Sequence, residues 1–189
     1  PGNMQDHAFI PGELAMERKA FWDEVGVLAR EQRGDHILAY MNLMLAKAGQ
    51  KGVPLGLADW RRRGADLPLF PGVDTWFERQ NARARALGVE LCHFIISSGN
   101  RELIEGSPIG HVFKRIYASA FMFDEASNAA GIALAVNYTS KTQFLFRINK
   151  HTLDEWDNTS INRAMAHDDR PVPFDRIVFF GDGDTDVRT

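Results

Sequence analysis

The chain has 189 residues, of which 44% are hydrophobic and 25% are charged, and its formal net charge is −3. These values are typical of one globular domain, or of one core with a small appendage, and they exclude intrinsic disorder and collagen-like structure. The slight acidic excess gives no support to nucleic-acid binding, and no apolar run approaches the roughly 18 residues of a membrane span. Because Cys92 is the only cysteine, no internal disulfide can form. We therefore expect a reducing, cytoplasmic setting, with neither a nucleic-acid nor a membrane partner.

The first third of the chain is predicted to be helical. Apolar residues at helical spacing predict one helix over 16–30 and another over 35–49, with Asp35 as the N-cap of the second. A shorter polar helix is predicted over 57–63, and its three consecutive arginines are expected to form a solvated face. Segment 13–66 is therefore expected to be an all-helical unit.

The rest of the chain alternates between helical patterns and apolar, strand-like runs. Helices are predicted over 73–87, 101–105, a segment that begins after Ser140, and 161–166. Strands are predicted over 89–96, 115–123, 131–137 and 177–180, with a turn over 124–128. Residues 1–12 contain two prolines and two glycines and are interpreted as a linker. This alternation predicts an α/β fold with a mainly parallel sheet.

An acidic segment follows the last apolar run. Asp182, Asp184 and Asp186 fall within five residues, and their carboxylates would repel one another unless a cation lay between them. Mg²⁺ prefers such oxygen ligands, and the neighbouring glycines allow the backbone to turn sharply. The alternative is an acidic turn on a solvated surface.

Two further segments carry polar groups at the start of a predicted helix. Ser97 and Ser98 end an apolar run, where hydroxyl and backbone N–H groups could bind an anion, although a plain N-cap would use the same residues. Lys141 opens another helix, a position that the helix macrodipole disfavours unless the lysine faces an anion. The alternative for Lys141 is a solvated surface side chain.

The order of these segments resembles the haloacid dehalogenase (HAD) superfamily of phosphohydrolases. Ile95-Ile96-Ser97 resembles the second motif of that family, Lys141 the third, and the pair Asp182 and Asp186 the fourth. The resemblance covers residues 69–189.

A branch related to phosphoserine phosphatases is the most similar, on the segments 137–144 and 181–187. The resemblance implies an α/β fold with a Rossmannoid parallel sheet flanked by helices. It also implies that 13–66 is a small helical cap, and that 1–12 and 67–189 form the core.

The resemblance further implies a Mg²⁺-dependent phosphatase that acts on a small phosphorylated metabolite through an aspartyl-phosphate intermediate. Lys141 and Asp186 would be the catalytic residues, and Ser97, Ser98 and Lys141 would bind phosphate. Asp182 and Asp186 would hold the metal.

The first motif of the family, D-x-D-x-T, supplies the nucleophile and does not occur in these 189 residues. We therefore expect residues before Pro1 and after Thr189. The main alternative is a non-catalytic HAD-fold protein with a binding or regulatory role. A different nucleotide-binding α/β protein would need a G-x-G-x-x-G loop, which is absent from the sequence. A dehalogenase of the same superfamily would not need the metal-binding acids.

Overall fold

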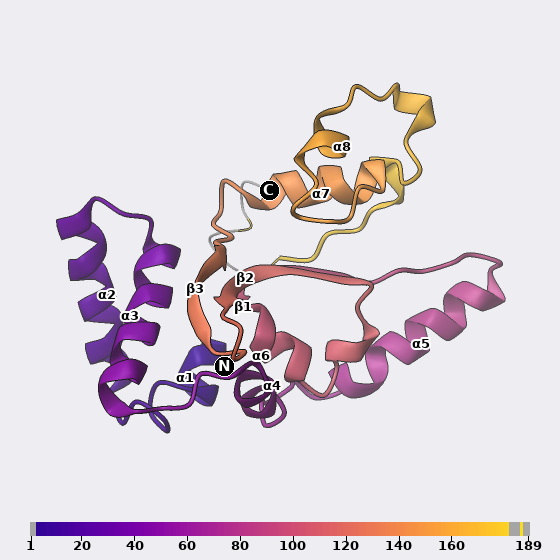
Figure 1. Cartoon of the computed structure of the whole chain (residues 1–189). Coiled ribbons are helices and arrows are strands. Elements are labelled where there is room, and N and C mark those ends of the chain that lie inside the picture. The colour runs from indigo at the N-terminus through magenta and orange to yellow at the C-terminus, as the bar shows by residue number, and fades with distance from the viewer. Residues whose placement is uncertain (1–2, 182–185, 187–189) are drawn as a thin grey trace. The chain divides into compact units, whose positions relative to one another are not determined.

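The computed structural model describes residues 3–181 and Asp186. The chain divides into two compact units, Pro1–Ala135 and Val136–Thr189. Helices and strands are mixed in the chain, so the α/β class is confirmed (Figure 1). Within the described part of the chain, no helix is long and apolar enough to cross a membrane.

A small mixed sheet forms the centre of the first unit. Strands β1 (Phe94–Asn100), β2 (Arg115–Phe123) and β3 (Ala129–Leu134) lie in that order, with β1 and β2 parallel and β2 and β3 antiparallel. The expectation of a mainly parallel sheet is thus wrong for the described strands. The reason is the tight turn between β2 and β3, because a parallel pair needs a crossover of a dozen or more residues.

The helices of the first unit follow the predicted periodicity closely. They are α1 (Met4–Ala8), α2 (Arg18–Gln32), α3 (His36–Lys51), α4 (Leu57–Gly64), α5 (Val73–Ala86) and α6 (Arg101–Gly106), with a short 3₁₀ helix at Gly110–Val112. Asp35 is confirmed as the N-cap of α3, because its carboxylate accepts hydrogen bonds from the backbone N–H groups of Ile37 and Leu38. The interpretation of 1–12 as a linker is wrong: α1 lies there, and Phe9 is fully buried.

One apolar core joins α1, α2, α3, α4 and α6 to the sheet. Phe21 of α2 and Met41 of α3 are fully buried in the same cluster as Leu103 of α6 and Phe121 of β2. Figure 1 shows α2 and α3 running side by side, and α4 packs closely on α6. Segment 13–66 is therefore helical, and its apolar face shares a core with the sheet.

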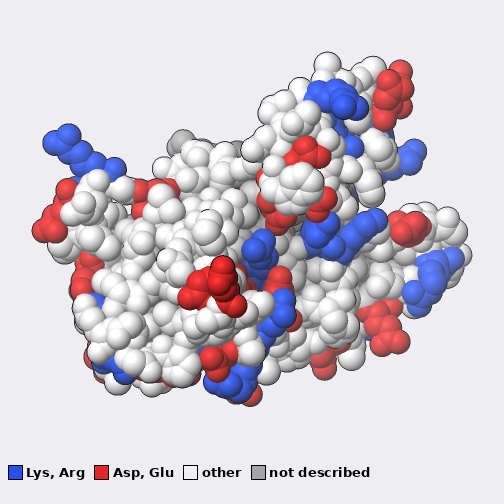
Figure 2. Space-filling model, viewed as in Figure 1, with Lys and Arg blue, Asp and Glu red and all other residues white. Residues whose placement is uncertain are grey.

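Of the three arginines of α4, Arg61 and Arg62 are exposed as predicted, but Arg63 is not. Arg63 is buried, with its guanidinium 5.3 Å from the ring centres of both Phe9 and Trp60, and it pairs with Glu13 at 2.7 Å. Arg61 pairs with Glu105 at 2.8 Å. The packing of Arg63 on aromatic rings could not be predicted from three consecutive arginines, because their spacing does not show which of them lies next to an aromatic side chain. Acidic and basic side chains are interspersed over the face of the molecule shown in Figure 2.

Strand β1 lies further along the chain than predicted. Residues 89–93 are irregular, and Val89 and Leu91 are 55% and 43% exposed, so the apolar run there packs against little. Helix α5 has no buried residue and lies away from the sheet in Figure 1. Residues 89–93 connect that helix to the sheet, and they do not pair as part of a strand.

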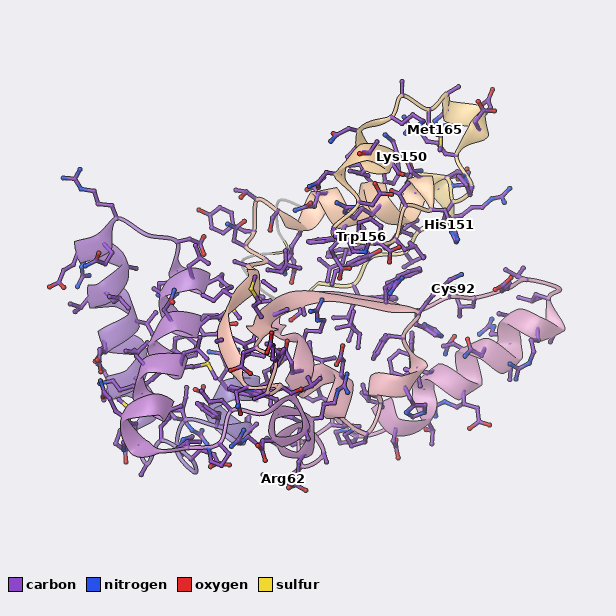
Figure 3. All side chains as sticks on the ribbon, in the orientation of Figure 1. Arg62, Cys92, Lys150, His151, Trp156 and Met165 are labelled. Carbon is purple, nitrogen blue, oxygen red and sulfur yellow. The ribbon has the colours of Figure 1, made fainter. Side chains whose placement is uncertain are left out.

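The second unit contains α7 (Lys141–Lys150), α8 (Asn158–Asn162) and two 3₁₀ helices at His167–Asp169 and Phe174–Arg176. Helix α8 begins and ends earlier than the predicted 161–166, because the Asp157 side chain caps it by accepting from the N–H groups of Thr159 and Ser160. Lys150, labelled in Figure 3, donates to the carbonyls of Ile161 and Arg163 at 2.7 and 2.9 Å.

The predicted strand 177–180 is wrong for the described structure. This segment is irregular, and Val178 and Phe180 are each 77% exposed. A strand is defined by its hydrogen-bonded neighbour, and among the described residues this segment pairs with no strand. Apolar composition alone does not supply that partner.

Candidate functional site

Lys141 and Asp186 meet in the second unit, 45 residues apart in sequence. The Lys141 ammonium group, on the first residue of α7, donates to Oδ1 of Asp186 and forms an ion pair with it. The Lys141 and Asp186 side chains are only 5% and 14% exposed. A pair so shielded from water interacts more strongly than a surface pair, because little solvent screens it.

The turn before α7 fixes the position at which this helix begins, which is Lys141. The Asn137 side-chain oxygen accepts from the backbone N–H groups of Thr139 and Ser140 at 3.1 and 3.0 Å, and from the Thr139 hydroxyl at 2.7 Å. The Ser140 hydroxyl in turn accepts from the Asn137 N–H at 2.9 Å. Ser140 stands at the N-cap position, but its hydroxyl bonds the turn and makes no bond to a helix N–H.

Gly181 lies directly against the Asp186 side chain. A Cβ atom at position 181 would sit 2.5 Å from Asp186 Cβ and 3.1 Å from its Oδ2. Only glycine leaves room for the carboxylate there. Asp186 therefore presents Oδ1 to Lys141 while its side chain packs closely on the backbone of Gly181.

Asp182, the other predicted metal ligand, lies outside the described residues, as does Asp184. No group of three or more His, Cys, Asp or Glu side chains able to hold a metal is found among the residues that are described.

Ser97 and Ser98 lie at the end of β1 in the first unit, where the strand register with β2 shifts between Ser97 and Asn100. The Ser97 hydroxyl accepts from the Gly99 N–H at 3.0 Å, and the Ser98 carbonyl accepts from the Tyr40 hydroxyl at 2.8 Å. Such irregularities redirect side chains next to functional sites. The strand runs through Asn100, so the prediction that it stops before the serines is wrong.

A buried polar cluster behind these serines was missed by the sequence analysis. Gln5 donates to the Asn100 side-chain oxygen at 2.9 Å, and the Phe121 N–H donates to a carboxylate oxygen of Glu102 at 3.0 Å. Asn100 and Glu102 are 0% and 1% exposed. Within the described part of the chain, the Ser98 hydroxyl, Asn100 Nδ2 and Glu102 Oε2 have no hydrogen-bond partner.

Burial changes the acid–base properties of this cluster. Loss of hydration raises the pKa of the Glu102 carboxyl above its ordinary value. Hydrogen bonds from backbone N–H groups lower this pKa, but they offset only part of the rise. The same cause raises the pKa of the Tyr40 hydroxyl, so that Tyr40 stays a hydrogen-bond donor toward Ser98. Neither residue stands out in the sequence, because a buried polar side chain on an apolar helix has no periodicity of its own.

A cavity of about 300 Å³ opens beside Ser97 in the first unit. Its wall comes from α1, from the segment before α5, from β1, and from α6 with the loop that follows it. The candidate site residues are thus distributed over both units: Lys141 and Asp186 form a pair in one, and Ser97 and Ser98 line the strand end in the other.

Comparison with known proteins gives one match. The chain is 26% identical, over 211 aligned positions, to an uncharacterized protein of Borreliella burgdorferi, and the alignment covers 98% of this chain and 71% of that protein. No family model matches the chain, and no solved structure matches it.

Proposed function

We propose that the protein is a Mg²⁺-dependent phosphohydrolase with a HAD-like, Rossmannoid core that acts on a small phosphorylated substrate. The shielded ion pair between Lys141 and Asp186 carries this proposal. These two residues stand at the positions that the resemblance assigns to the third and fourth motifs. The parallel pairing of β1 with β2 supports the same type of core.

In this proposal the described residues bind and orient the phosphoryl group. The resemblance assigns the Ser97 hydroxyl and the Ser98 N–H to phosphoryl oxygens, and it assigns the Lys141 ammonium to their negative charge. Asp186 holds Lys141 in place through the ion pair. The nucleophile is an aspartate of the D-x-D-x-T motif, which these 189 residues do not contain.

Asp182 and Asp186 are the proposed ligands of Mg²⁺, which when bound supplies positive charge at the phosphoryl oxygens. This assignment follows from the resemblance of Asp182 and Asp186 to the fourth motif. The helices of 13–66 are the proposed cap, and the Tyr40 hydroxyl of α3, which donates to the Ser98 carbonyl, lies at the strand end that carries the proposed phosphate-binding serines.

The proposal is tested by assaying the full-length gene product against a panel of phosphate monoesters, with Mg²⁺ and with EDTA. We expect phosphate release only with Mg²⁺, and a loss of about 100-fold or more in kcat for Lys141→Met. Phosphate binding with no turnover of any ester would contradict the proposal and favour the non-catalytic alternative.

A further inference from the structure

The cavity beside Ser97 has an apolar wall. Eight of its eleven lining residues are aliphatic, aromatic, methionine or proline, including Met4, Leu67, Phe70 and Ile109. The other three are His7, Ser97 and Ser107, and none of the described lining residues is Lys, Arg, Asp or Glu. A ligand in this cavity therefore meets few hydrogen-bonding groups, and His7 is the titratable group among the described lining residues.

Two of the three polar residues of the wall are serines, and their hydroxyls differ in what they can still donate. The Ser107 hydroxyl already donates to the Ile104 carbonyl at 2.7 Å. The Ser97 oxygen accepts from Gly99, which leaves its own hydrogen to be donated to a phosphoryl oxygen. A phosphoryl group at Ser97 would thus place the rest of its molecule against the apolar wall.

We propose that the leaving group of the substrate is a small, uncharged and largely apolar alcohol. This inference rests on the proposed phosphohydrolase function. An ammonium or carboxylate group that packed against this wall would lose part of its hydration and would find no Lys, Arg, Asp or Glu among the described lining residues. Apolar surface, in contrast, gains free energy in proportion to the area removed from water.

The size of the cavity limits the leaving group. A volume of about 300 Å³ is at the lower end of the range for ligand sites, so this cavity suits a small leaving group. In the reaction the P–O bond of the ester breaks, the phosphoryl group passes to the aspartate nucleophile and then to water, and the alcohol leaves with a proton.

The test compares kcat/KM of the full-length gene product for ethyl, butyl and hexyl phosphate with that for O-phosphoserine and glucose 6-phosphate, all with Mg²⁺. We expect kcat/KM to rise about fourfold per added methylene until the cavity is full. The zwitterionic and polyhydroxyl esters should be at least about 100-fold poorer than hexyl phosphate.

A pair of variants ties this preference to the cavity. Phe70 lines it and is 61% exposed, so Phe70→Asp should fold and should lower kcat/KM for hexyl phosphate about tenfold or more, with little change for ethyl phosphate. Leu87→Asp is the matched control, because Leu87 is 72% exposed and does not line the cavity.

Each outcome has a distinct meaning. Equal or better turnover of O-phosphoserine or glucose 6-phosphate, or equal effects of the two variants, would overturn the inference while the phosphohydrolase function stands. Hydrolysis of none of the five esters would overturn the proposed function and this inference with it.

Discussion

The ion pair between Lys141 and Asp186 is the residue-scale observation on which the proposed function rests. Lysine is disfavoured at the first position of a helix, where the macrodipole is positive, unless an anion faces it. Here Asp186 is that anion, and the Asn137 turn sets the position at which the helix begins. Both residues could be identified from the sequence. A lysine at a helix N-terminus and a cluster of acidic residues are each unfavourable unless a group of opposite charge lies nearby.

Removing one member of this shielded pair should destabilise the protein. Lys141→Met leaves the Asp186 carboxylate with little water around it and without its cation, and we expect a loss of about 3 kcal/mol in the free energy of unfolding. Urea unfolding checks the value. The double variant Lys141→Met/Asp186→Asn should recover at least half of the loss, whereas a single variant as stable as the wild type would show that the pair contributes nothing.

Glu102 should make stability depend on pH in an unusual direction for an acid. Because burial raises its pKa in the folded state, the folded protein binds this proton more tightly than the unfolded chain does. Its contribution to stability is therefore full below about pH 4.3, the ordinary glutamate value, and is lost as pH rises through the raised pKa.

The variant Glu102→Gln has no proton to lose at this position. Its melting temperature relative to the wild type should therefore increase as pH rises from about 4 to 8. Calorimetry of both proteins over this range measures the difference. A difference that is constant with pH would mean that Glu102 titrates normally.

Among the elements, helices were predicted better than strands. The spacing of apolar residues and caps such as Asp35 act within one helix, so α2, α3, α4 and α5 lie within about two residues of their predicted bounds. Strand limits depend on a neighbour elsewhere in the chain. This is why β1 begins at Phe94 instead of 89, and why 177–180 is irregular in spite of its apolar composition.

The contact between α4 and α6 depends on two glycines. A Cβ atom at Gly64 would overlap the carbonyl oxygen of Leu103, and one at Gly106 would overlap that of Arg61. Backbone atoms cannot move aside as a flexible side chain can, so Gly106→Ala should cost at least about 2 kcal/mol of stability.

Gly49 of α3 provides the matched control, because a Cβ there would meet no atom within 4 Å. Gly49→Ala should stabilise the protein by roughly 0.5–1 kcal/mol through helix propensity. Thermal or urea unfolding of the two variants separates these effects. Similar stability changes in both would contradict the close packing of α4 on α6.

At the scale of the whole molecule, the α/β class was predictable, but the partners with which the helical segment packs were not. The change of composition near residue 66 stays a predicted boundary, and the chain divides into compact units between Ala135 and Val136. The apolar faces of α2 and α3 could have served a core of their own. They pack instead in one core with Leu103 and Phe121, and no local pattern indicates which distant residues complete a core.

Only part of the candidate site could be predicted from the sequence. Ser97, Lys141 and Asp186 were recognisable because each belongs to a short motif. Gln5, Tyr40 and Glu102 were not, since their burial arises from packing between segments far apart in the sequence. The cavity beside Ser97 likewise combines short segments from four parts of the chain.

The most direct test of the proposed phosphohydrolase is a Mg²⁺ titration of phosphate-ester hydrolysis by the full-length gene product, with Asp182→Asn compared with Asp184→Asn. Asp182 is a proposed metal ligand, so its variant should lose about 100-fold in rate, and excess Mg²⁺ should restore only part of it. Asp184 has no proposed ligand role, and its variant should stay within about fivefold of the wild type. Greater damage in the Asp184→Asn variant, or hydrolysis that proceeds equally without Mg²⁺, would contradict the proposed metal site.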